Sequence, residues 1–186
     1  LKTPIPEEHP LNPINPYGAT KFMVERMLQD YDRAYGLKYI SLRYFNAAGA
    51  DPEGQLGECH QPETHLIPNL LLYFLGKKEN FMVYGYDFPT RDGTAIRDYI
   101  HVTDLARAHV LALDRLVSEN SSQVLNLGSS RGYSVLEVIK ETERVTGLTR
   151  PINFGQRREG DVPVLLASSE KAEKYLDWQR KYSELY

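Results

Sequence analysis

The sequence lacks the features that mark several large classes of protein. Cys59 is the only cysteine among 186 residues, so neither a disulfide framework nor a site of several thiolates is expected, and a reducing cytoplasm fits that count. No apolar run reaches the roughly 18 residues that a membrane-spanning helix needs, so no membrane partner is expected. The formal net charge is −3 with both signs mixed, which argues against a nucleic-acid-binding or polybasic surface.

Helical and strand patterns alternate along the chain. After a proline-rich approach, Asn15 suits a helix N-cap, Pro16 suits the first turn and Gly36 suits the end of that helix. Further helices are expected over 66–76, 103–116, 134–147 and 169–175. Strands are expected at KYISLRYF (ending at Asn46), FMVYG, RDYIHV, VLNLG and INF. The alternation predicts an α/β fold with parallel strands, whose carboxyl ends bind ligands.

The segment NPYGATK places Tyr17 and Lys21 four residues apart at the start of the first predicted helix. Residues at this spacing share a helix face, so the Lys21 ammonium would favour the ionised phenol and make Tyr17 a general base. The spacing alone is weak evidence, because Tyr73 and Lys77 repeat it in YFLGK. That second pair ends a predicted helix, where Lys77 would face the terminal carbonyls.

Further segments follow in order: LRYFNAAGA, HLIP, DGTAIRDYIHVTDLA, LNLGSSRGYSV and RREGD. Together with NPYGATK they resemble the UDP-glucose 4-epimerases, which are extended short-chain dehydrogenases/reductases, over essentially the whole chain. The resemblance implies the remainder of a parallel Rossmann-type sheet, with residues 1–49 as the rest of an NAD-binding domain. It implies a smaller α/β UDP-sugar-binding domain at 50–186, from which about 101–128 return to the main sheet.

The resemblance also implies that part of the enzyme is missing. The Gly-rich phosphate loop, the acidic ribose ligand and the upstream catalytic serine or threonine of such enzymes are not found, since GSSRG at 128–132 lies too late and lacks the spacing. The chain is therefore expected to be a C-terminal part that lacks most of the NAD-binding half and is inactive alone.

The resemblance assigns roles to individual residues. Tyr17 and Lys21 become the catalytic pair and contact NAD, and Phe45 borders the nicotinamide. The UDP-sugar is expected to contact Asn46, His65, Leu66, Met82, Val83, Tyr84, Arg97, Arg158, Asp161 and Leu165.

Several of these assignments have a specific chemical content. Arg97 and Arg158 would hold the diphosphate bidentately, and Asp161 would hold the uridine ribose or brace an arginine. Best-known members have asparagine at the position of His65. A tyrosine at the position of Leu165 excludes N-acetyl groups, whereas a smaller residue admits them.

Each assignment also has a structural alternative. Asn46 could form an Asx turn, His65 could cap a helix, and either arginine could lie on a solvated surface. The segment MVY at 82–84 could be a buried edge strand, and Leu165 could belong to an apolar core.

No metal site is expected, because no two histidines show zinc spacing with a third ligand, and His109 is expected in the core. The implied reaction is NAD-dependent interconversion of UDP-glucose and UDP-galactose through transient oxidation at sugar C4, by a cytoplasmic homodimer when complete. The alternatives are an epimerase for UDP-N-acetylglucosamine or UDP-pentoses, a nucleotide-sugar 4,6-dehydratase, and an inert or UDP-binding remnant.

Overall fold

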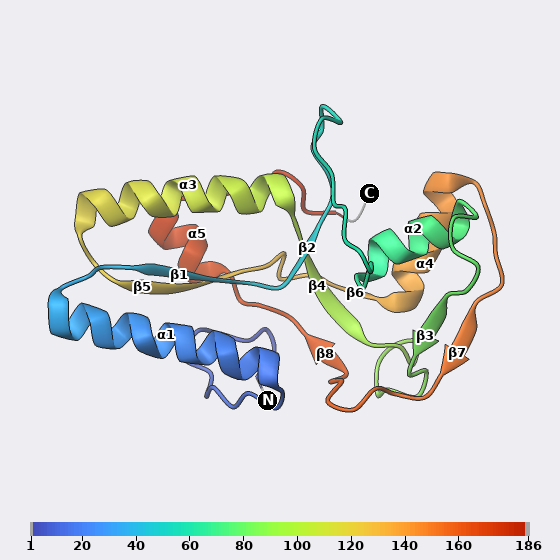
Figure 1. The fold of residues 1–186 in the computed structure, drawn as a ribbon, viewed down its shortest axis with the longest axis horizontal. Coiled ribbons are helices and arrows are strands. Elements are labelled where there is room, and N and C mark those ends of the chain that lie inside the picture. Colours follow the sequence, from blue (N-terminus) through green and yellow to red (C-terminus); the bar gives the residue numbers. More distant parts are fainter. Residues whose placement is uncertain (1, 185–186) are drawn as a thin grey trace.

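Helices and strands alternate in the computed structural model, which describes residues 2–184 (Figure 1). The helices are α1 (Pro16–Tyr35), α2 (Leu66–Phe74), α3 (Val102–Glu119), α4 (Val135–Thr146) and α5 (Glu170–Leu176). The strands are β1 (Ile40–Tyr44), β2 (Asn46–Ala48), β3 (Met82–Tyr84), β4 (Ile96–His101), β5 (Gln123–Leu127), β6 (Gly132–Ser134), β7 (Asn153–Gly155) and β8 (Val164–Leu165). This is the predicted α/β fold, although its short strands are distributed over separate sheets.

The strand pairs are mostly parallel. β1 pairs with β5, and β3 pairs with β7, both in parallel. β4 pairs in parallel with β2 and β8 and antiparallel with β6. Figure 1 shows α1 on one side of the β1–β5 pair and α3 with α5 on the other, whereas α2 and α4 lie together near β3 and β7. The predicted division of the chain at residues 49 and 50 stays a prediction.

Two separate hydrophobic clusters hold these elements together. The first joins α3 and α5 to β4 and β5, and consists of Ile100, Ala108, Ala112, Leu125, Leu127, Ala172, Leu176 and Trp178. The second joins α2 and α4 to β3, and consists of Leu70, Tyr73, Phe74, Phe81, Val83, Val138 and Ile139. Full burial of a leucine, isoleucine, valine or phenylalanine side chain contributes about 1.5–3 kcal/mol, so each cluster stabilises its own set of elements.

α1 begins and ends where the sequence predicts. The side chain of Asn15 accepts a hydrogen bond from the backbone N–H of Gly18 at 2.8 Å, and Gly36 ends the helix with φ of +69°, a conformation that favours glycine. Its apolar stripe nevertheless stays uncovered, because no residue of α1 is buried. The exposed members include Met23, Val24, Met27, Tyr31 and Tyr35.

Three local predictions were wrong. Asn46 begins β2 instead of ending the preceding strand, because the chain leaves β5 after Tyr44 and pairs next with β4. His101, not Thr103, caps α3, since its ring nitrogen accepts the N–H of Thr103 at 3.1 Å. His109 is exposed instead of buried, with its ring edge-on to Tyr44.

Across residues 2–184, no helix combines the length and apolar character needed to cross a membrane.

Candidate active site

Tyr17 and Lys21 lie together at the start of α1. The helix places them on one face, with the Lys21 ammonium 5.1 Å from the centre of the Tyr17 ring. Tyr17 is 71% exposed, so its hydroxyl is accessible. Lys21 forms no ion pair with any residue of the described part of the chain. The arrangement therefore has the accessible phenol and adjacent cation that a tyrosine base requires.

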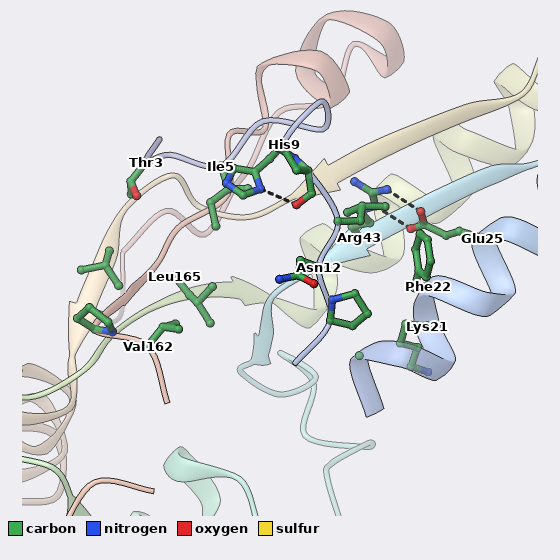
Figure 2. Close-up of a pocket in the computed structure, with 16 residues that line it drawn as sticks. Thr3, Ile5, His9, Asn12, Lys21, Phe22, Glu25, Arg43, Val162 and Leu165 are labelled. Atoms are coloured by element: carbon green, nitrogen blue, oxygen red, sulfur yellow. Dashed lines mark hydrogen bonds and ion pairs between the residues drawn. The ribbon is translucent and has the colours of Figure 1, made fainter. Parts of the chain in front are cut away.

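Lys21 also lines an apolar cavity beside α1, which has a volume of about 640 Å³ (Figure 2). Leu165 of β8 lines the same cavity from the opposite side, so a predicted cofactor residue and a predicted sugar residue face one space. Arg43 and Glu25 complete part of the wall. Their bidentate ion pair, at 2.6 and 2.7 Å, ties β1 to α1 and raises the pKa of Arg43.

The register of the strands connects this cavity to the predicted diphosphate site. Leu165 lies opposite Arg97 in the β8–β4 pair. Arg97 donates to the carbonyl oxygen of Val162 at 2.9 Å and lies 3.5 Å from the carboxylate of Asp161. The Arg97 side chain is only 16% exposed, and burial lowers its pKa.

Asp161 joins the two predicted arginines. Its second carboxylate oxygen accepts from Nε of Arg158 at 3.1 Å, so one carboxylate contacts both guanidinium groups. Arg158 is more exposed than Arg97, and its guanidinium lies 5.3 Å from the centre of the Tyr84 ring. The arrangement supplies two neighbouring cations for an anionic ligand, with Asp161 orienting them.

Asn46 lies on β2 beside β4, opposite Tyr99. Its side-chain amide donates to the backbone oxygen of Asp98 at 2.8 Å, so it forms a contact between strands instead of the Asx turn considered from the sequence. Burial raises the pKa of Tyr99 to about 12, which keeps that phenol neutral. Phe45 is half-buried at the switch between β1 and β2.

The remaining predicted residues lie around the second hydrophobic cluster. Val83 is buried in it, whereas Met82 and Tyr84 on either side of Val83 are exposed. Leu66 begins α2 and packs against the same cluster. His65 occupies the N-cap position of α2 without a capping hydrogen bond from its side chain, and instead contacts Glu58 and Glu63.

Sequence reasoning missed the role of Asp98, which is fully buried. Its carboxylate accepts from the backbone and hydroxyl of Ser129 at 2.6 and 2.7 Å and from the backbone of Ala167 at 3.0 Å. A Cβ on Gly128 would lie 2.4 Å from Asp98 Oδ2, so glycine permits this approach. Burial raises the pKa of Asp98, while these hydrogen bonds favour its charge. The signal that could have revealed Asp98 is an aspartate within a segment predicted to be a buried strand, RDYIHV.

Sequence reasoning also missed a cluster of potential metal ligands. No histidine pair shows zinc spacing with a third ligand in the sequence, yet the structure brings Glu58, His60, Glu63 and His65 together, with their potential ligand atoms within 4.8 Å of one another. Hydrogen bonds from the backbone N–H groups of His65 and Thr64 lower the pKa of Glu63. The signal was five ligand-type residues within eight positions of one loop, namely these four and Cys59.

Comparisons with known proteins identify the family of the chain. A model of the NAD dependent epimerase/dehydratase family matches residues 2–128. The curated UDP-glucose 4-epimerase of Halalkalibacterium halodurans is 50% identical over 185 residues, which are 100% of this chain and 55% of that protein. The chain thus spans about half the length of the curated relatives it matches.

Two solved structures share the fold. The crystal structure of UDP-glucose 4-epimerase from Brucella ovis in complex with NAD has a TM-score of 0.95 at 50% identity, covering 100% of this chain and 57% of that chain. The enzyme from Bifidobacterium longum in complex with NAD+ and UDP has a TM-score of 0.91 at 41% identity, covering 97% and 54%.

Proposed function

The chain belongs to the NAD dependent epimerase/dehydratase family, and from this premise we propose that the full-length protein interconverts UDP-glucose and UDP-galactose with NAD as cofactor. One observation carries the proposal. Lys21 and Leu165 line one cavity, Leu165 lies opposite Arg97 in the strand register, and Asp161 contacts both Arg97 and Arg158. This arrangement supports an interpretation in which the base beside Lys21, an apolar space and a pair of cations serve one site.

In this proposal Tyr17 is the general base. It accepts the proton of the sugar 4-hydroxyl when C4 is oxidised and returns a proton when C4 is reduced on its other face. Lys21 remains beside the phenol and can contact the ribose of the cofactor. NAD, when bound, supplies the hydride acceptor and donor. Phe45 is proposed to border the nicotinamide.

The UDP part of the substrate is proposed to bind on the other side of the cavity. Arg97 and Arg158 neutralise the diphosphate, and Asp161 orients them. Asn46, His65 and Leu66 are proposed as further substrate contacts, and Met82, Val83 and Tyr84 as the segment beside the uracil. Firm binding of UDP with few polar groups for the hexose suits a reaction in which the oxidised sugar must turn over within the site.

A second candidate activity is epimerisation of UDP-N-acetylglucosamine. Leu165 lines the cavity with an aliphatic side chain, which is smaller than the tyrosine expected to exclude N-acetyl groups. Epimerisation of UDP-pentoses remains a further alternative of the same class.

The experiment is to express a protein of the relatives' full length and measure conversion of UDP-galactose into UDP-glucose. We expect turnover that depends on NAD, and no turnover by the 186-residue chain alone. UDP binding without conversion of any UDP-hexose would instead assign a binding-only protein, and a 4-keto-6-deoxy sugar product would assign a dehydratase. Turnover by the isolated chain would refute its proposed inactivity.

The full-length protein is further proposed to be a cytoplasmic homodimer. The single, exposed Cys59 fits a reducing compartment, and the uncovered apolar stripe of α1 offers a surface for a partner. Light scattering after size-exclusion chromatography measures the oligomeric state, and fractionation of cells measures the compartment. A monomeric mass at micromolar concentration would contradict the dimer.

A further inference from the structure

The loop between β2 and α2 extends beyond the sheets and ends at His65 (Figure 1). Within it, one carboxylate oxygen of Glu58 lies 2.8 Å from Nδ1 of His60 and 2.6 Å from Nδ1 of His65. A carboxylate oxygen of Glu63 lies 3.1 Å from the same nitrogen of His65, and its other oxygen lies 3.9 Å from that of His60. Each of the two imidazoles therefore directs its Nδ1 toward both carboxylates.

From this convergence we propose that Glu58, His60, Glu63 and His65 form a binding site for a divalent transition-metal ion of the zinc class. The proposal stands independently of the proposed enzymatic activity. It uses Nδ1 of His65 and leaves the other ring nitrogen available for a substrate contact.

The donor set suits such an ion. Two imidazole nitrogens and two carboxylate oxygens are ligands that zinc accepts at about 2.0–2.2 Å, in a tetrahedron whose ligand atoms lie roughly 3.3 Å apart. The four groups here already lie within 4.8 Å of one another, so small side-chain rotations suffice. Two carboxylates with two neutral imidazoles carry a charge of about −2, which a divalent cation balances. Imidazole favours zinc, nickel and copper over magnesium or calcium, which prefer oxygen ligands.

The site is also partly preorganised. Glu63 is only 10% exposed on its side chain, and one of its oxygens accepts the backbone N–H groups of Thr64 and His65, both at 2.7 Å. These bonds fix the carboxylate where the loop enters α2, as second-sphere partners do for metal ligands. The rings of His60 and His65 lie with centroids 5.0 Å apart and tilted by 61°, which allows both nitrogens to face one point. Cys59 is not a member of this group.

The test is titration of the purified chain, stripped with EDTA, with ZnCl₂ by isothermal calorimetry, and with CoCl₂ by visible absorption. We expect about one ion per chain and the intense absorption bands of tetrahedral cobalt. His60→Ala and Glu58→Gln should each weaken binding by about tenfold or more and remove those bands. His109→Ala is the matched control, because it removes an exposed histidine outside the cluster and should bind like the parent.

Three outcomes would overturn the proposal. In the first, the chain does not bind about one ion. In the second, both His60→Ala and Glu58→Gln keep the full metal affinity of the parent. In the third, His109→Ala loses as much metal affinity as the two cluster variants. Circular dichroism confirms that each variant is folded. If His60→Ala fails to fold, Glu58→Gln decides, since this near-isosteric change removes only the charge and one acceptor.

Discussion

The two tyrosine–lysine pairs have the same spacing and opposite surroundings. Tyr17 lies in the first turn of α1 and is 71% exposed, beneath the ammonium of Lys21. Tyr73 is 5% exposed, and its hydroxyl donates to the backbone oxygen of Pro151 at 2.5 Å. Lys77 lies beyond the end of α2 at Phe74, so it does not share a helix face with Tyr73. Spacing identifies a possible pair, whereas helix bounds and burial decide whether the phenol is available to react.

The helices that carry these tyrosines are also held in different ways. α2 buries Leu70, Tyr73 and Phe74 in the second hydrophobic cluster. No residue of α1 is fully buried, and its attachments include the ion pair of Glu25 with Arg43 and the contacts of Asp32 with Lys38 and Ser122. The reactive candidate is therefore on the helix with polar attachment, and the structural tyrosine is on the packed one.

The largest expected effect separates the two tyrosines by their chemistry. In the full-length protein, Tyr17→Phe should lower kcat by about 10²–10⁴-fold, the scale of general-base loss, with UDP affinity nearly unchanged. Tyr73→Phe is the control and should leave kcat nearly unchanged. A coupled assay gives kcat, and calorimetry gives UDP affinity. Equal losses of kcat in both variants would remove Tyr17 from the role of base.

The next effect separates the same residues by their contribution to folding. Tyr73→Ala should lower the free energy of unfolding by about 3–5 kcal/mol, because it leaves a cavity among Phe74, Phe81 and their neighbours and an unpaired carbonyl at Pro151. Tyr17→Ala should cost within about 0.5 kcal/mol, as for an exposed position. Urea denaturation measures both. A larger loss in Tyr17→Ala than in Tyr73→Ala would contradict the comparison.

A smaller effect tests whether the cavity beside Lys21 contains the sugar. In the full-length protein, Leu165→Tyr should reduce kcat/KM for UDP-N-acetylglucosamine relative to UDP-glucose by about 5–150-fold, since steric rejection is worth about 1–3 kcal/mol. The parent should use UDP-glucose well and the N-acetylated sugar measurably. The measurement compares kcat/KM for both sugars in both proteins. An unchanged ratio would place the sugar away from Leu165.

The smallest effect concerns the stability of the chain at acidic pH. Hydrogen bonds from the side chain of Lys38, and then Ser122, hold the pKa of Asp32 below its ordinary value of 3.8. A depressed pKa means that this contribution to stability is present above the ordinary value and is lost as pH falls through the lower, folded-state value. Asp32→Asn should therefore lower the free energy of unfolding at pH 7. The free energy of unfolding should also differ less between pH 7 and pH 3 in this variant than in the parent. Urea denaturation at both pH values measures this difference, and an equal pH dependence in both proteins would contradict it.

Much of the local structure was predictable because its causes are local. Asn15, Pro16 and Gly36 bound α1 by capping, by a preset φ and by a left-handed φ, and none of these needs a distant contact. Ser134 and Glu137 likewise form a capping box at α4. The change of strand partner after Tyr44 was not predictable, because both sides of the change read as one continuous strand.

The candidate site divides in the same way. Sequence motifs selected Tyr17, Lys21, Arg97 and Arg158 as the charged and reactive groups. The structure places Lys21 beside Tyr17 and joins Arg97 to Arg158 through Asp161. Sequence reasoning found neither the cluster of Glu58, His60, Glu63 and His65 nor the buried carboxylate of Asp98. The cluster depends on how the loop before α2 folds back on itself. The burial of Asp98 depends on how Ser129 and Ala167 pack against its strand.

The sequence by itself determined the alternation of helices and strands, the ends of α1 and α4 and the residue types able to carry acid–base and anion-binding chemistry. These properties follow from propensity, capping and side-chain chemistry within a few residues. Only the tertiary structure decided that Tyr73 is buried, that the stripe of α1 is uncovered and that Leu165 faces the cavity of Lys21. Burial and convergence depend on contacts between segments far apart in the chain, and periodicity specifies that a face is apolar without specifying what covers it.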